Sequence, residues 1–323
     1  MITWGMVGNS HDASLAVFDE NRLLWAALSK DFSGIPHDPD PNQEMLDEAL
    51  RNYGKPAEIY WYERPFLKSL RQLRAGQGWR FKENNIRRYL SQWGVPPKIK
   101  YTQHHLSHAA YAYYTQPHDD CAVICLDSIG EFETLTIWHG KNNKLKKLFS
   151  QGYPHSLGLF YSAMTQRMGL VPQRDEYLVS DWANKGDPLR LMNTMLKEIV
   201  KVNQDASRPY IRMRENLHRG CRWWRPELKT QQDMYDIAAA TQAVFEYCVK
   251  ILSNWAHWKT NNGSAVALAG GGALNKRAMD NISKDWKHLW VPPNPGDPGS
   301  CVGAVLANTQ TKVTLDNRWY KKV

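Results

Sequence analysis

Short apolar runs near the amino terminus predict three adjacent β-strands. The runs are Trp4–Val7, Ser14–Phe18 and Leu23–Ala27, and they are separated by Gly8–Ser10 and Asp19–Asn21, both of turn composition. Strands that follow one another through tight turns form a meander, in which each strand pairs with the next. We therefore expect the chain to open with a three-stranded antiparallel unit.

Farther along, helical and strand-like patterns alternate. The expected strands are Ile59–Tyr62, Ile99–Thr102, Ala122–Leu126, Thr134–Trp138 and Ala265–Ala269. The expected helices are Asn42–Asn52, Leu106–Tyr114, Asp233–Trp258, Ala273–Ile282 and Cys301–Asn308. This alternation predicts an α/β protein. A second meander, starting near Cys121, echoes the first and indicates a duplicated fold, with an amino-terminal lobe over residues 1–117 and a carboxyl-terminal lobe over 118–323.

Composition and charge narrow the class of protein. The 323 residues are 42% hydrophobic and 23% charged, which is sufficient for a sizeable core. The chain holds 41 basic and 32 acidic residues, a net charge of +9 that favours an anionic partner such as nucleic acid or a phosphorylated substrate. Its five cysteines form no CxxC motif, and no apolar run approaches the roughly 18 residues of a membrane span. We expect a cytoplasmic protein with no membrane contact.

Basic residues concentrate in two segments. Phe66–Leu90 holds seven basic residues and one acid, and Lys201–Thr230 holds eight basic residues against three acids, with Tyr210, Trp223 and Trp224 interleaved. Cations for phosphates and rings for unpaired bases suit a nucleic-acid surface. The alternative is an ordinary solvated face.

The run Gln103–Ala110 carries the first candidate chemistry. In a helix, His104 and His108 are i and i+4, so both imidazoles lie on one face and can bind one metal ion. Chance clustering or helix capping are the alternatives. Asp127 follows the apolar strand Ala122–Leu126 and precedes a glycine-containing turn, so it is a candidate third ligand.

Asp297 is the candidate fourth ligand, although it could simply cap the helix that follows. Two histidines and two aspartates suit Fe²⁺, Mn²⁺ or Zn²⁺. Gly270, Gly271 and Gly272 follow the strand Ala265–Ala269 and precede a helix. Such a turn can cradle a phosphate with backbone N–H groups, or it can be only a tight turn.

In order and spacing, these motifs resemble those of the O-carbamoyltransferase family, which includes nodulation and antibiotic-tailoring carbamoyltransferases. That family is similar to the universal tRNA threonylcarbamoyl-transfer proteins. The matching segments are Gly8–Ser14, His104–Ala110, Asp127 at 19 residues after His108, Pro154–Ser162, the glycine turn and Asp297.

The resemblance implies an actin/Hsp70-like (ASKHA) fold, with two ribonuclease-H-like lobes around a cleft that holds metal and nucleotide. It implies a divalent metal, most readily iron, at His104, His108, Asp127 and Asp297. It places the adenylate part of carbamoyl-adenylate, formed with ATP, on Gly270, Gly271, Gly272 and Asn275. It also places the catalytic pair His11 and Asp12 near the carbamoyl group, although their run is also good turn composition.

The chain departs from the pattern of that family in several places. Two lysines that the family favours are replaced by Pro36 and Leu178. We expect no carboxyl-terminal domain of the kind that makes carbamoyl-adenylate, and carbamoyl phosphate as the ultimate donor. The basic segments favour 5-hydroxymethylcytosine, in DNA or as a nucleotide, as the hydroxyl acceptor. Alternatives are a small natural product as acceptor, or a non-catalytic subunit that binds metal and nucleotide.

Overall fold

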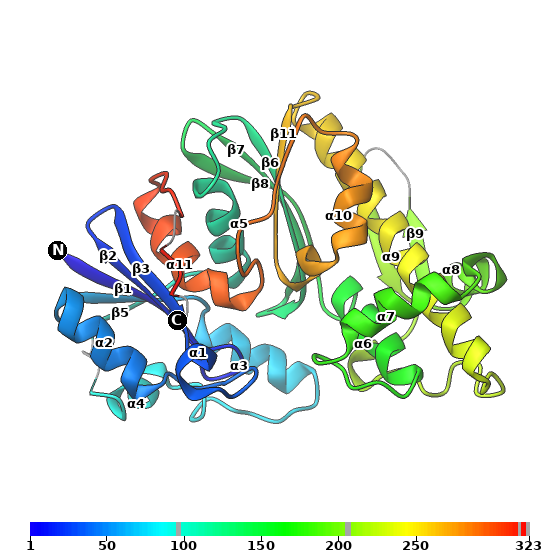
Figure 1. Cartoon of the computed structure of the whole chain (residues 1–323), viewed down its shortest axis with the longest axis horizontal. Coiled ribbons are helices and arrows are strands. Elements are labelled where there is room, and N and C mark those ends of the chain that lie inside the picture. The colour runs from blue at the N-terminus through cyan, green and yellow to red at the C-terminus, as the bar shows by residue number, and fades with distance from the viewer. Residues whose placement is uncertain (95–97, 204–207, 316–317, 321–323) are drawn as a thin grey trace.

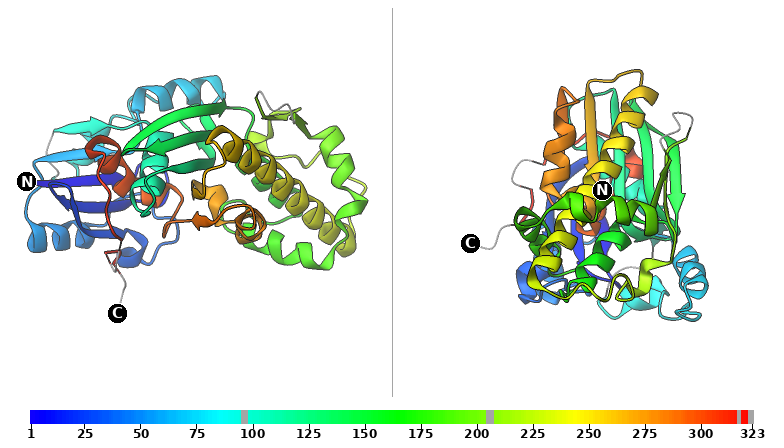
Figure 2. Two further views of the ribbon diagram at one scale, coloured as in Figure 1. Left: turned by 90° about the horizontal axis from the view of Figure 1, so that it is seen from above. Right: turned by 90° about the vertical axis from the view of Figure 1, so that its right-hand side faces the viewer.

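A computed structural model of the protein describes residues 1–94, 98–203, 208–315 and 318–320. Two five-stranded sheets form its two halves, with helices α5 and α11 between them (Figure 1). A group of helices extends beyond the second sheet, which gives the molecule its elongated shape (Figure 2).

The first sheet has the strand order β3-β2-β1-β4-β5. Its strands are β1 (Ile2–Val7), β2 (Ser14–Asp19), β3 (Arg22–Leu28), β4 (Glu58–Trp61) and β5 (Ile99–Tyr101). The first three pair antiparallel, which confirms the predicted meander, and β4 and β5 continue the sheet in parallel.

The second sheet repeats this arrangement. Its order is β12-β11-β6-β7-β8, with an antiparallel meander followed by parallel strands on the other side of β6. The strands are β6 (Cys121–Gly130), β7 (Glu133–Lys141), β8 (Lys144–Gly152), β11 (Ala265–Ala269) and β12 (His288–Trp290). Because both sheets place a meander beside two parallel strands, the predicted duplication is confirmed.

The helices connect and cover the sheets. The first half contains α1 (Lys30–Ser33), α2 (Gln43–Tyr53), α3 (Pro65–Arg74), α4 (Ile86–Ser91) and α5 (His104–Tyr114). The second half contains α6 (Leu157–Arg167), α7 (Glu176–Trp182), α8 (Met192–Glu198), α9 (Gln231–Lys259), α10 (Lys276–Ser283) and α11 (Ser300–Thr309). A small ribbon adds β9 (Val200–Asn203) and β10 (Tyr210–Met213). Short 3₁₀ turns are η1 (Ala183–Lys185), η2 (Pro188–Arg190), η3 (Leu217–Arg219), η4 (Gly271–Leu274) and η5 (Asp297–Gly299).

Strand β6 is buried on both faces, which explains its continuous apolar run. Ile124 and Leu126 face the core beneath α6 and α9, whereas Val123 and Cys125 face the core around α5 and α11. All five cysteines are buried thiols, as expected for small core residues.

Two sequence predictions require correction at element boundaries. Strand β6 does not end at Leu126 but continues to Gly130 through an irregularity in its pairing with β7. The single helix expected over Ala273–Ile282 is divided, because the Asn275 side chain accepts the Ala278 N–H at 3.0 Å and caps a new helix, α10. In the described chain, no helix combines the length and the apolar character needed to cross a membrane.

Helices α5 and α11 approach so closely that only glycine fits at the contact. A Cβ atom on Gly303 of α11 would lie 1.9 Å from the Ser107 carbonyl oxygen of α5. On its other side, α11 meets β1, where a Cβ atom on Gly5 would lie 1.8 Å from the Cys301 carbonyl oxygen. The first sheet and α5 are thus joined through the backbone of α11.

We predict that Gly303→Ala lowers the free energy of unfolding by about 3 kcal/mol, because the added methyl group forces two packed backbones apart. Urea denaturation followed by circular dichroism measures this change. Gly263→Ala is the control, since its methyl group would lie 3.2 Å from the Thr260 hydroxyl and no backbone atom is nearer than 3.4 Å. Equal stability of the two variants would contradict the proposed contact.

Candidate metal centre

Four side chains from three separate regions meet between the two sheets. His104 is the first residue of α5 and His108 lies one turn later, Asp127 lies in the irregular part of β6, and Asp297 begins η5. One ligand atom from each lies within 4.8 Å of every other. His104, His108 and Asp297 are buried, and Asp127 is partly buried. The structure therefore brings together all four residues that the resemblance implied as metal ligands.

The distances within this group fit a shared metal ion. The His104 and His108 Nε2 atoms are 3.0 Å apart. Asp297 Oδ1 lies 3.4 Å from the first and 3.3 Å from the second, and Asp127 Oδ2 lies 3.3 Å from His104 Nε2. Ligands at about 2.1 Å from one ion, with angles of about 90–110°, are separated by about 3.0–3.4 Å. These four of the six donor–donor separations match those around a single metal ion, and the two that remain, from Asp127 to His108 and to Asp297, are within 4.8 Å.

The charges of the group also call for a cation. Burial would lower the pKa of His104, but Asp297 and Asp127 raise it well above the usual value. Burial would likewise raise the pKa of Asp297, but His104 and His108 hold it well below the usual range. A protonated His104 thus compensates the two carboxylates, and a divalent ion would take the place of that proton, because an imidazole that binds a metal is neutral.

Neighbouring residues orient the two histidines. The Ser300 hydroxyl lies 3.2 Å from His108 Nδ1, so His108 is held with Nε2 toward the carboxylates. A Cβ atom on Gly130 would lie 2.0 Å from the His104 ring, which explains the glycine at this point of β6. His105 points elsewhere, with its Nδ1 atom 3.0 Å from the Thr136 hydroxyl. Sequence reasoning missed the roles of Ser300 and Gly130.

The turn between β1 and β2 reaches the same centre. His11 Nδ1 lies 2.9 Å from Asp12 Oδ2, and His11 Nε2 lies 3.6 Å from Asp297 Oδ2. Burial would lower the pKa of His11, but the two carboxylates raise it to about 9. The Ser14 hydroxyl donates to the Pro298 carbonyl at 2.8 Å and fastens this turn to η5.

His37 is a further residue that sequence reasoning missed. Its Nδ1 atom lies 3.0 Å from Asp12 Oδ1, so Asp12 contacts two imidazoles. Burial would raise the pKa of Asp12, but these two histidines lower it. The signal that could have identified His37 was its place directly after Pro36, in a segment that the family resemblance already covered.

The glycine turn lies beside the metal group. Gly270 has a φ of +84°, and a Cβ atom there would lie 2.2 Å from the Leu126 carbonyl oxygen. A Cβ atom on Gly272 would lie 2.7 Å from Leu126 Cβ, so both glycines are needed for packing on β6. Gly271 differs, because its nearest neighbour would be Asp127 Oδ1 at 3.8 Å. Its open face is directed toward the metal group.

Asn275 has structural partners in this structure. Its side chain caps α10, and it exchanges two hydrogen bonds of 2.9 Å with Gln242. The expected strand–turn–helix cradle is also modified, since Gly271 and Gly272 themselves lie in the 3₁₀ turn η4, which precedes α10. The role of Asn275 in nucleotide binding stays a prediction.

We predict that His104→Ala and Asp297→Ala each lower the bound metal by more than half, because each removes one of four donors. Mass spectrometry of metal content after dialysis measures the loss. His139→Ala is the matched control, since His139 pairs with Asp120 outside the four-residue group. Full metal content in both site variants would show that the ion binds elsewhere.

Comparisons with known proteins bear on the family of this chain. A family model described as the carbamoyltransferase N-terminus matches residues 62–306. The uncharacterised protein sll1178 of Synechocystis is 28% identical over 94% of this chain and 56% of its own length. The nodulation protein NolNO of Sinorhizobium fredii is 26% identical over 65% of this chain and 31% of its own length. The chain thus spans about half the length of these relatives, or less.

A solved structure shares the fold. Component A of the (R)-2-hydroxyglutaryl-CoA dehydratase of Acidaminococcus fermentans aligns over 96% of this chain and 99% of its own, with a TM-score of 0.51 and 13% identity. The predicted actin/Hsp70-like fold is confirmed. Because the family model covers residues 62–306, well over half of the sequence, the chain belongs to the family defined by the carbamoyltransferase N-terminus.

Proposed function

We propose that this protein transfers a carbamoyl group from carbamoyl phosphate to a hydroxyl group. The observation that carries the proposal is the place of His11, which stands between Asp12 and the candidate metal ligand Asp297. A proton-bearing group therefore borders the candidate metal centre, in a chain of the carbamoyltransferase family. The sequence resemblance supports the same assignment.

The glycine turn is the part of the site where we place the nucleotide and the carbamoyl donor. Gly271 leaves its backbone open beside Asp127, so the phosphate of a nucleotide can approach it closely. We propose that an adenine nucleotide binds here, and that carbamoyl phosphate reacts either directly or as carbamoyl-adenylate.

The transfer itself is a substitution at the carbamoyl carbon. The acceptor oxygen forms a bond to that carbon, and the bond between the carbon and the phosphate oxygen breaks. The phosphate, or AMP from the adenylate, leaves with the electron pair, and the hydroxyl proton passes to a carboxylate. Asp12 is the candidate for that proton, since its carboxylate lies beside His11 at the edge of the candidate metal centre.

His11 is better suited to donate a hydrogen bond to the substrate than to act as the general base. Its pKa of about 9 keeps the imidazole protonated near neutral pH. A protonated imidazole stabilises the negative charge that develops on the carbamoyl oxygen. His104, His108, Asp127 and Asp297 would hold a divalent ion, Fe²⁺ in preference to Mn²⁺ or Zn²⁺, which supplies Lewis-acid polarisation when bound.

We further propose that the acceptor is 5-hydroxymethylcytosine, in DNA or as a nucleotide. The net charge of +9 and the two basic segments support a phosphate-bearing acceptor. Of the two tryptophans expected to stack on a base, Trp224 is only 2% exposed and is part of the core, whereas Trp223 is 53% exposed. Only Trp223 is placed to contact an external base.

We predict that the protein, supplied with carbamoyl phosphate, ATP and Fe²⁺, adds one carbamoyl group to hydroxymethylcytosine in DNA or in the mononucleotide. Mass spectrometry of the digested products measures the gain. Transfer to a small polyol but to neither nucleic-acid form would show that the proposed acceptor is wrong, while the proposed carbamoyltransferase activity would stand. Binding of metal and nucleotide without turnover of any acceptor would instead identify a non-catalytic subunit.

We predict that Gly271→Val weakens nucleotide binding at least about tenfold, because its side chain occupies the place where backbone must approach phosphate. Isothermal titration with ATP measures the affinity, and circular dichroism verifies the fold. Gly270→Ala is the contrasting variant, since it collides with Leu126 and should lose stability. A folded Gly271→Val protein with unchanged affinity for ATP would argue against nucleotide binding at this turn.

A further inference from the structure

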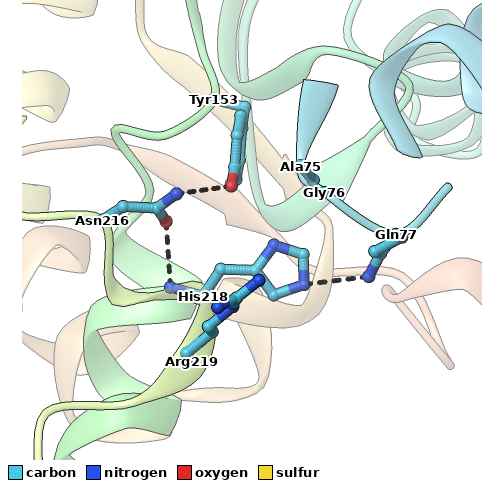
Figure 3. Close-up of a pocket in the computed structure, with 7 residues that line it drawn as sticks. All are labelled: Ala75, Gly76, Gln77, Tyr153, Asn216, His218 and Arg219. Atoms are coloured by element: carbon cyan, nitrogen blue, oxygen red, sulfur yellow. Dashed lines mark hydrogen bonds between the residues drawn. The ribbon is translucent and has the colours of Figure 1, made fainter. Parts of the chain in front are cut away.

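The two basic segments meet at a cavity outside the metal centre. The cavity has a volume of about 330 Å³. Its walls come from the end of α3, the segment after β8 and the turn η3, so it connects the two halves of the chain (Figure 3). The residues that line it are Ala75, Gly76, Gln77, Tyr153, Asn216, His218 and Arg219, and none of them is acidic.

Hydrogen bonds hold the lining side chains in place. Asn216 Nδ2 donates to the Tyr153 hydroxyl at 2.6 Å, and the His218 N–H donates to Asn216 Oδ1 at 3.1 Å. Gln77 Nε2 lies 3.3 Å from His218 Nε2, which connects the two walls (Figure 3). The cavity is therefore built from ordered groups that bridge distant parts of the sequence.

Arg71 lies next to this cavity and is only 8% exposed. Its Nη1 atom donates to Gln77 Oε1 at 3.0 Å, whereas its buried Nε atom has no partner among the described residues. The nearby carboxylate of Glu63 already accepts Lys68 Nζ at 2.6 Å. A buried guanidinium without a carboxylate partner calls for an anion.

One further cation, Arg219, and the imidazole of His218 border the same space. Arg219 reaches across to α3, where a Cβ atom on Gly76 would lie 3.5 Å from its Nη2 atom. Within the described chain, the buried His218 Nδ1 atom also has no hydrogen-bond partner. Arg219 and His218 thus line the cavity, and Arg71 is hydrogen-bonded to the lining residue Gln77. An anion with several acceptor oxygens would meet a local excess of positive charge there.

Both walls of the cavity continue into the metal centre. On one side, the segment that leads into α3 includes Tyr62, whose ring lies 5.3 Å from the His104 ring. On the other side, Ser156, three residues after Tyr153, donates to the Asp127 carbonyl at 3.3 Å. The cavity is therefore connected to the candidate metal ligands through the chain segments that form its walls.

We propose that this cavity binds a phosphate group of the acceptor, which is a nucleotide or a nucleotide within a polynucleotide. The inference rests on the proposed function, since it names the substrate class for the same reaction. The planar guanidinium groups suit bidentate contacts to phosphate oxygens. Anchoring there would hold the acceptor while its hydroxyl reaches the metal centre.

The test is direct binding without any carbamoyl donor. The probes are the hydroxymethylcytosine deoxynucleoside, its 5′-monophosphate and a duplex that contains the same base. Arg219→Glu places a negative charge in the cavity, and Arg222→Glu is the matched control, since Arg222 is exposed in the same basic segment but does not line the cavity. Titration calorimetry or fluorescence anisotropy measures each affinity.

We expect the parent protein to bind the monophosphate or the duplex at least about tenfold more tightly than the nucleoside, and Arg219→Glu to remove about tenfold of that affinity. Arg222→Glu should retain it. If the duplex is the bound form, Arg219→Glu should also reduce the slope of log affinity against log salt by about 1. A preference for the monophosphate alone would identify the free nucleotide as the source of the phosphate.

Two outcomes would overturn the inference. One is equal affinity for nucleoside, monophosphate and duplex, and the other is an equal effect of Arg219→Glu and Arg222→Glu. Carbamoyl transfer that proceeds despite either result would remove the cavity's role but leave the proposed function intact. Phosphate binding that depends on Arg219, in a protein that transfers no carbamoyl group, would refute the proposed function but leave the cavity as an anion site.

Discussion

The close contact between α5 and α11 determines where the candidate metal ligands stand. Helix α5 carries His104 and His108, and Asp297 lies in the turn that leads directly into α11. Because the Ser107 carbonyl occupies the space that a side chain on Gly303 would fill, the two helices cannot shift apart or together without loss of packing. Three of the four donors are therefore held at fixed separation by backbone contact, before any ion binds.

Strand β6 contributes the fourth donor and also supports the glycine turn. Its pairing with β7 is irregular after Leu126, which places Asp127 toward the metal group. The backbone of Leu126 packs against Gly270, while Gly271 stays open beside Asp127. Strand β6 would thus support both a phosphate at this turn and an ion at the centre. This shared support favours binding of the two ligands side by side.

Local pattern determined a large part of the fold. The first meander, the first two strands of the second meander, the long helix α9 and the buried strand β11 follow from apolar periodicity and turn residues, which act over a few positions. Strand β8, which completes the second meander, was not predicted. The spacing of His104 and His108 likewise placed both imidazoles on one helical face. The predicted helix boundary was wrong where a side chain competed with that pattern. At Asn275, the side-chain cap divides the expected helix into η4 and α10.

The sequence by itself therefore determined most strands of the two sheets, several of the helices, the repeated meander and the candidate ligand types, but it did not predict strands β8 and β12 or helix α6. Only the tertiary structure decided which distant groups meet. It brought His37 to Asp12, buried Trp224 in the core, and joined Gln77 of one basic segment to His218 of the other at a cavity. The physical reason is that local propensity acts between near neighbours, whereas these contacts depend on how whole sheets and helices pack, which no short stretch of sequence encodes.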